Sequence, residues 1–122
     1  MTLPRAARLR LELERVPSAG AIARRAIDAE IDGLLSAETR SSLMLVVSEL
    51  VNNAVVHGTG RYVDFELMVS ADGIRGAVRD GGSSFSGGGH SVGGGFGLPI
   101  VNSETRRWGV STDGGMCVWF EL

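Results

Sequence analysis

The stretch that decides the fold is Ser48–Gly58, SELVNNAVVHG, with the apolar run that leads into it from Leu43. On a helix, Glu49, Asn53 and His57 recur at every fourth position and lie on one face. A carboxylate can accept a proton and an amide oxygen can bind Mg²⁺, so this face indicates a polar ligand. A solvated helix face that ends in a His57–Gly58 cap is the alternative. The neighbouring apolar face predicts core residues: Leu43, Val46, Val47, Leu50, Val51 and Ala54.

Three elements are predicted around this stretch. Ala7–Glu14 alternates between apolar and polar residues, which is typical of a half-exposed strand. Ser18 is the expected N-cap of a helix that runs to about Ile31. The main helix opens at Ser36 or Ala37 and extends to about His57, with Gly58 as its C-cap. The apolar face of the first helix is expected to contain Ile22, Ala26, Ala29 and Ile31.

The second half of the chain predicts two hairpins and one further helix. The first hairpin turns at Asp72-Gly73, and the last turns across Thr112–Gly115. Consecutive hairpins favour a sheet with mostly antiparallel neighbours, and three helices suffice to cover one face. We therefore predict a single α+β domain over residues 1–122, a two-layer sandwich with a mixed, mostly antiparallel sheet of about five strands. The predicted elements are strands Arg61–Ser70 and Ile74–Arg79, helix Leu98–Arg107, and strands Trp108–Ser111 and Met116–Leu122.

Gly81–Gly97 contains nine of the eighteen glycines and no basic residue. Glycine permits close backbone approach to a ligand, and the helix that follows would add its N-terminal N–H donors. A loop of this length in so small a domain is typical of a lid or binding loop. The segment therefore indicates a phosphate cradle, although a flexible linker has the same composition. It contains neither of the common glycine-rich nucleotide motifs.

Composition excludes several kinds of function. A net charge of −2 gives no reason to expect nucleic-acid or membrane binding, and all twelve basic residues are arginine. The absence of lysine rules out a P-loop lysine and Schiff-base chemistry. The single cysteine, Cys117, cannot form an internal disulfide and is expected to be buried. With no membrane-length apolar run and no signal-peptide pattern, we expect a cytoplasmic protein.

Three segments in order resemble the GHKL (Bergerat-fold) ATP-binding superfamily. Ser48–Gly58 is similar to its N-box, Val78–Phe85 (VRDGGSSF) to its first glycine box, and Gly93–Val101 (GGGFGLPIV) to its second. The likeness extends from about Leu9 to Leu122 and is greatest for the small anti-sigma-factor serine kinases. The resemblance implies an ATP-dependent protein serine kinase that phosphorylates an anti-anti-sigma partner of the STAS fold and sequesters a sigma factor. It also implies a homodimer.

The resemblance assigns a role to each matching residue. Glu49 corresponds to the catalytic glutamate that orients or deprotonates the attacking hydroxyl, and Asn53 to the magnesium ligand. Asp80 corresponds to the aspartate that recognises adenine, and Gly82 leaves room for the base. The residues implied at the phosphate end of the ATP site are Gly93, Gly95, Gly97 and Leu98.

The chain departs from the pattern of the superfamily in three places. Val56 occupies a position that is often basic, the glycine loop has no arginine or lysine, and Met116-Cys117 replaces a common threonine. These departures favour an alternative in which the chain is a non-catalytic switch that binds a partner, with weak or lost ATP binding. A structural domain that is independent of ATP is a third possibility.

Overall fold

The computed structural model describes residues 6–81, 98–112 and 115–122. The chain begins with strand β1 (Ala7–Glu14), followed by helices α1 (Ala19–Ile31) and α2 (Ala37–His57). Strands β2 (Tyr62–Ser70) and β3 (Gly73–Asp80), helix α3 (Leu98–Glu104), and strands β4 (Arg107–Ser111) and β5 (Met116–Glu121) complete it. The predicted order of elements is confirmed. No helix in the described ranges is long and apolar enough to cross a membrane.

The five strands form one sheet in the order β1-β2-β3-β5-β4. All four neighbouring pairs among the described strands are antiparallel, so the expected mixed sheet is in fact antiparallel throughout. The two predicted hairpins are the pairs β2–β3 and β4–β5, and the remaining pairs, β1–β2 and β3–β5, are also antiparallel. The α+β sandwich itself is confirmed.

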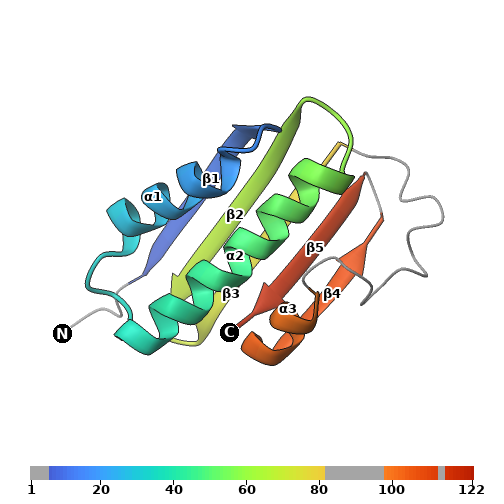
Figure 1. The fold of residues 1–122 in the computed structure, drawn as a ribbon. Helices are drawn as coiled ribbons and strands as arrows, with labels where there is room; N and C mark the ends of the chain where they lie inside the picture. The colour runs from blue at the N-terminus through green and yellow to red at the C-terminus, as the bar shows by residue number, and fades with distance from the viewer. Residues whose placement is uncertain (1–5, 82–97, 113–114) are drawn as a thin grey trace.

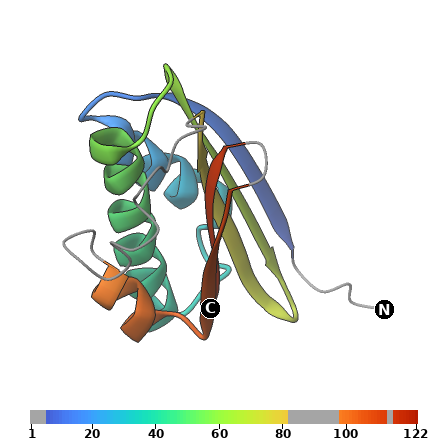
Figure 2. The same ribbon diagram turned by 90° about the vertical axis from the view of Figure 1, so that its right-hand side faces the viewer.

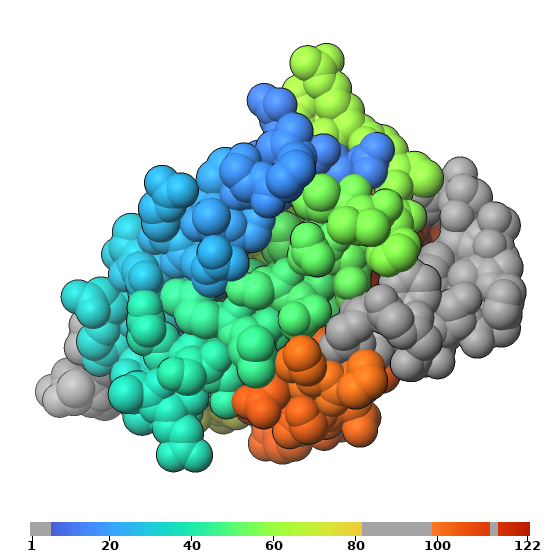
Figure 3. All heavy atoms as spheres, viewed as in Figure 1, coloured from blue at the N-terminus to red at the C-terminus, as the bar shows by residue number. Residues whose placement is uncertain are grey.

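The helices form the second layer of the sandwich. Figure 1 shows α1 and α2 lying over the sheet, roughly along the direction of its strands, and Figure 2 shows all three helices on the same side of it. In the space-filling view, α2 lies between α1 and α3 (Figure 3). The helix with the predicted polar face is therefore the central helix of its layer.

The ends of the helices follow from local hydrogen bonds. Ser36 is the N-cap of α2, and its hydroxyl accepts from the Thr39 amide at 3.1 Å. Gly58 is the C-cap as predicted, with an extended backbone, and its amide donates to the Ala54 carbonyl. Ser18 is at the N-cap of α1, but its side chain makes no capping hydrogen bond.

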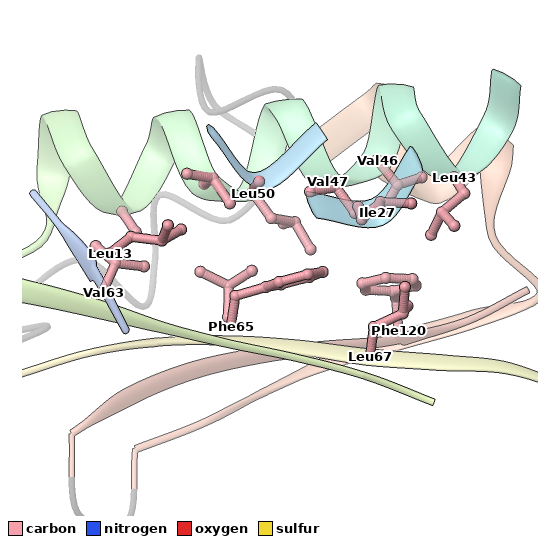
Figure 4. Packing of buried hydrophobic residues seen from close by; sticks show 14 of the residues in the cluster. Leu13, Ile27, Leu43, Val46, Val47, Leu50, Val63, Phe65, Leu67 and Phe120 are labelled. Carbon is pink, nitrogen blue, oxygen red and sulfur yellow. The ribbon is translucent and has the colours of Figure 1, made fainter. Parts of the chain in front are cut away.

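The core lies between α1, α2 and the inner face of the sheet (Figure 4). The six residues predicted for the apolar face of α2 are all buried. The prediction for α1 was wrong except at Ile31, because its buried face follows Ala19, Ala23, Ile27 and Ile31 at every fourth position. Ile22 lies on the adjacent stripe and is 44% exposed. Cys117 is buried, as expected.

The third helix ends earlier than the sequence indicates. We expected a helix from Leu98 to Arg107, but α3 ends at Glu104. The Arg106 amide donates to the Glu121 carbonyl at 2.8 Å, and Arg107 already pairs with Glu121 in the sheet. Arg106 and Arg107 therefore do not continue the helix, because they bond to β5.

Candidate functional site

The polar face of α2 borders the core. Glu49 and Asn53 are half-buried, whereas His57 is exposed. Ser42 lies on the same face, seven residues before Glu49, and its hydroxyl donates to the Glu104 carboxylate of α3 at 2.8 Å. This hydrogen bond places the Glu49–Asn53 stripe on the α3 side of the helix. Glu49 and Asn53 are four residues apart, which separates them by about 6 Å along the helix axis.

Asp80 is the only charged residue that is buried in the described part of the chain, with 6% of its surface exposed. It is the last residue of β3, where its neighbours across the sheet are Val63 and Met116. An isolated turn aspartate would be solvated. Burial of a carboxylate is costly without compensating interactions, so the position of Asp80 indicates a specific role.

The end of α2 lies directly against Asp80. A Cβ atom added to Gly58 would be 2.7 Å from Asp80 Oδ2 and 2.3 Å from the Ala54 carbonyl oxygen. Two residues further on, a Cβ atom at Gly60 would be 3.3 Å from the Gly81 Cα, and the Gly81 amide donates to the Thr59 carbonyl at 3.2 Å. The end of α2 and the residues that follow it therefore meet Asp80 and Gly81 at the end of β3.

Arg15 holds this junction and was not identified from the sequence. Its Nε donates to the Gly60 carbonyl and its Nη1 to the Val55 carbonyl, both at 2.7 Å. Because Val55 is in the last turn of α2, the guanidinium also neutralises the negative end of the helix dipole. A single arginine after β1 had no pattern that could have revealed this contact across the fold.

A second arginine reaches the helix beside Glu49. Arg24 of α1 is half-buried, and its Nη1 donates to the Ser48 hydroxyl at 2.9 Å. Ser48 in turn donates to the Met44 carbonyl at 2.7 Å. The Arg24–Ser48 bond therefore couples α1 to α2 one residue before the proposed catalytic glutamate.

The residues at which the chain departs from the superfamily pattern lie in different places relative to the site. The sheet register puts Met116 opposite Asp80, on the inner face, and Cys117 opposite Arg79, on the outer face. Met116 therefore borders the site and Cys117 does not. Val56 is 60% exposed on α2.

Four predicted glycines lie outside the described residues: Gly82, expected beside the adenine base, and Gly93, Gly95 and Gly97, expected at the phosphate end. Leu98 is the first residue of α3. The described ranges contain no group of three or more histidine, cysteine, aspartate or glutamate side chains that could hold a metal ion. Mg²⁺ bound together with phosphate oxygens needs only one or two protein ligands, so the Asn53 amide fits that mode of binding.

Comparison with known proteins identifies the class to which this arrangement belongs. Residues 9–122 match the sequence model of the histidine kinase-like ATPase domain, and the chain belongs to this family, which is of the GHKL type. Among solved structures, the chain is similar to the RsbU and RsbW domains of Rv1364c from Mycobacterium tuberculosis, with a TM-score of 0.72 and 17% identity. That likeness covers 93% of this chain and 31% of the other, and at this identity it concerns the fold. Comparison with curated protein sequences gives no match.

Proposed function

We propose that the chain is an ATP-binding anti-sigma regulatory protein with serine kinase activity, which phosphorylates a STAS-type anti-anti-sigma protein and sequesters a sigma factor. The observation that carries the proposal is the buried Asp80 carboxylate against Gly58, in a chain of the histidine kinase-like ATPase family. A buried carboxylate at the end of a strand can accept a hydrogen bond from the exocyclic amine of adenine. The backbone at Gly58 leaves no room for a Cβ atom, and a Cβ atom at Gly60 would lie tightly, 3.3 Å from the Gly81 Cα.

The polar face of α2 supports the catalytic part of the proposal. When bound, Mg-ATP would supply the transferable phosphoryl group, and its metal would neutralise charge on the phosphates. Asn53 would hold the Mg²⁺ ion through its amide oxygen. Glu49, one helical turn earlier and half-buried, would orient the serine hydroxyl of the partner and accept its proton.

The experiment combines purified protein, Mg-ATP and a cognate STAS protein. We expect transfer of phosphate to the STAS serine, a decrease in rate of about 100-fold or more in Glu49→Ala, and unchanged nucleotide affinity in that variant. Asn53→Ala should weaken magnesium-dependent binding, and the adjacent, exposed Asn52→Ala is its matched control. Asp80→Asn should abolish nucleotide binding.

The departures at Val56 and in the glycine loop favour a second candidate, a non-catalytic switch that binds its partner with weak or no ATP binding. If wild type binds its STAS partner and transfers no phosphate, the kinase proposal is wrong and the switch remains. If wild type also binds no nucleotide in a titration, an ATP-independent domain remains. We propose that the chain works in the cytoplasm as a homodimer. Sedimentation of the purified protein tests the dimer, and fractionation of cells tests the location.

A further inference from the structure

The outer face of the sheet is covered by no described element, as Figure 2 shows. Alternation along the strands directs one set of side chains away from the helices. On β1 these are exposed, among them Arg8 and Arg10. This face is on the other side of the sheet from α2 and Glu49, so it is separate from the candidate ATP site.

A groove of about 620 Å³ runs across this face from β1 to β4. Its lining contains four arginines and two glutamates, an excess of two positive charges on a chain whose net charge is −2. These charged residues are Arg8, Arg10, Arg75, Arg107, Glu66 and Glu121. The groove is therefore a local basic site on an acidic protein.

The apolar part of the groove is held in place by a glycine. A Cβ atom at Gly109 would be 2.5 Å from Cζ2 of Trp119, so the indole ring lies flat against the backbone of β4. The Arg107 guanidinium is 5.9 Å from the ring centroid. Met68 lines the same groove and is 39% exposed. Together they offer a fixed aromatic surface with a flexible apolar neighbour.

The positive charge is unevenly neutralised. Glu121 binds the Arg107 guanidinium through both carboxylate oxygens, at 3.2 and 2.9 Å, and lies 3.4 Å from Arg75. On the β1 side, by contrast, Arg8 and Arg10 form no ion pair within the described residues. Their guanidinium groups therefore keep their donors available to an external carboxylate.

We propose that this groove binds an acidic segment of a partner protein, with carboxylates on Arg8 and Arg10 and one apolar side chain on Trp119. The charge excess selects a negative partner, and the two oxygens of a carboxylate match the planar fork of an arginine. The apolar anchor gives a role to a tryptophan that is partly exposed among the charged residues of this groove. The proposal is independent of ATP binding and of kinase activity.

The test is a fluorescence titration of the whole chain with a short labelled peptide of alternating glutamate and aspartate around one central leucine. We expect saturable binding that weakens with salt, about tenfold weaker binding in Arg10→Glu, and weaker binding in Trp119→Leu. Arg25→Glu makes the same change of charge on the exposed surface of α1 and is the matched control. Arg25→Glu should alter the affinity for the peptide less than twofold.

Each contrary result overturns the proposal. Equal weakening by Arg10→Glu and Arg25→Glu would show a response to net charge alone. Tighter binding of an oligo-dT strand than of the peptide would assign the groove to nucleic acid. Absence of peptide binding, with self-association in sedimentation that Arg10→Glu abolishes, would assign it to a second copy of the chain. Circular dichroism and nucleotide titration of each variant separate loss of folding, or of the ATP site, from loss of this surface.

Discussion

Replacement of Gly58 by alanine tests the junction between α2 and Asp80 directly. Gly58 has φ −77° and ψ −179°, an extended conformation that alanine adopts without strain, so the cost arises from contacts alone. The new Cβ would be 2.3 Å from the Ala54 oxygen and 2.7 Å from Asp80 Oδ2. Ordinary carbon–oxygen contacts are about 3.3 Å or longer. Relief of this overlap should cost about 1–3 kcal/mol, the usual range for overpacked sites.

That cost must appear in one of two measurements. If the fold retains the carboxylate in place, the free energy of unfolding in urea falls by the same amount. If Asp80 moves, its own overlap is relieved and the affinity for Mg-ATP in calorimetry falls by up to about 140-fold, while the overlap with the Ala54 oxygen still lowers stability. Gly20→Ala is the control, since its Cβ would contact only the Arg24 guanidinium at 3.5 Å, within a helix. Wild-type stability together with wild-type affinity in Gly58→Ala would refute the described geometry.

Two further predictions concern charged side chains that bind across the fold. Arg15→Ala should lower the free energy of unfolding by about 1–3 kcal/mol, because two charge-assisted hydrogen bonds to the Gly60 and Val55 carbonyls are lost. Arg15→Lys should recover only part of this free energy. Urea denaturation of both variants measures the effect, and full recovery by lysine would contradict the contact with two carbonyls. The pKa of Glu121 is lowered by its hydrogen bonds with Arg107, so its contribution to stability is present above the ordinary carboxyl pKa and is lost as the pH falls through the lowered value. Glu121→Gln should therefore reduce the acid-side slope of stability against pH in urea denaturation. Equal slopes in wild type and Glu121→Gln would contradict the ion pair.

The sequence predicted those parts of the fold that depend on local patterns. The core face of α2 and the alternation of β1 were correct because periodicity follows from burial. The predicted end of α3 was wrong because Arg107 pairs with Glu121, and this contact is with a strand further along the chain. The predicted buried face of α1 was wrong because Ile22 is apolar and yet exposed, and the local sequence does not show that Ile27 is the buried one.

The candidate site divides in the same way. Glu49, Asn53 and Asp80 could be proposed from the sequence because they lie in motifs with fixed order and spacing. Arg15 could not, since its two acceptors are backbone carbonyls 40 and 45 residues away, and any residue type supplies a carbonyl. The groove on the outer face was also missed, because it depends on the register of all five strands and on the lack of side chain at Gly109.

Strand β3 connects the two candidate surfaces and also keeps them apart. Asp80 is at its end and on the inner face, whereas Arg75 is on the outer face, five residues earlier and about 17 Å away at the usual rise per residue. A substitution at Arg10 or Trp119 can therefore alter the outer groove with no direct contact to Asp80. If the outer groove and the ATP site do prove to be energetically coupled, β3 is the element through which to seek the coupling. Nucleotide affinity measured with and without the acidic peptide gives that coupling free energy, and equal affinities would show two independent sites.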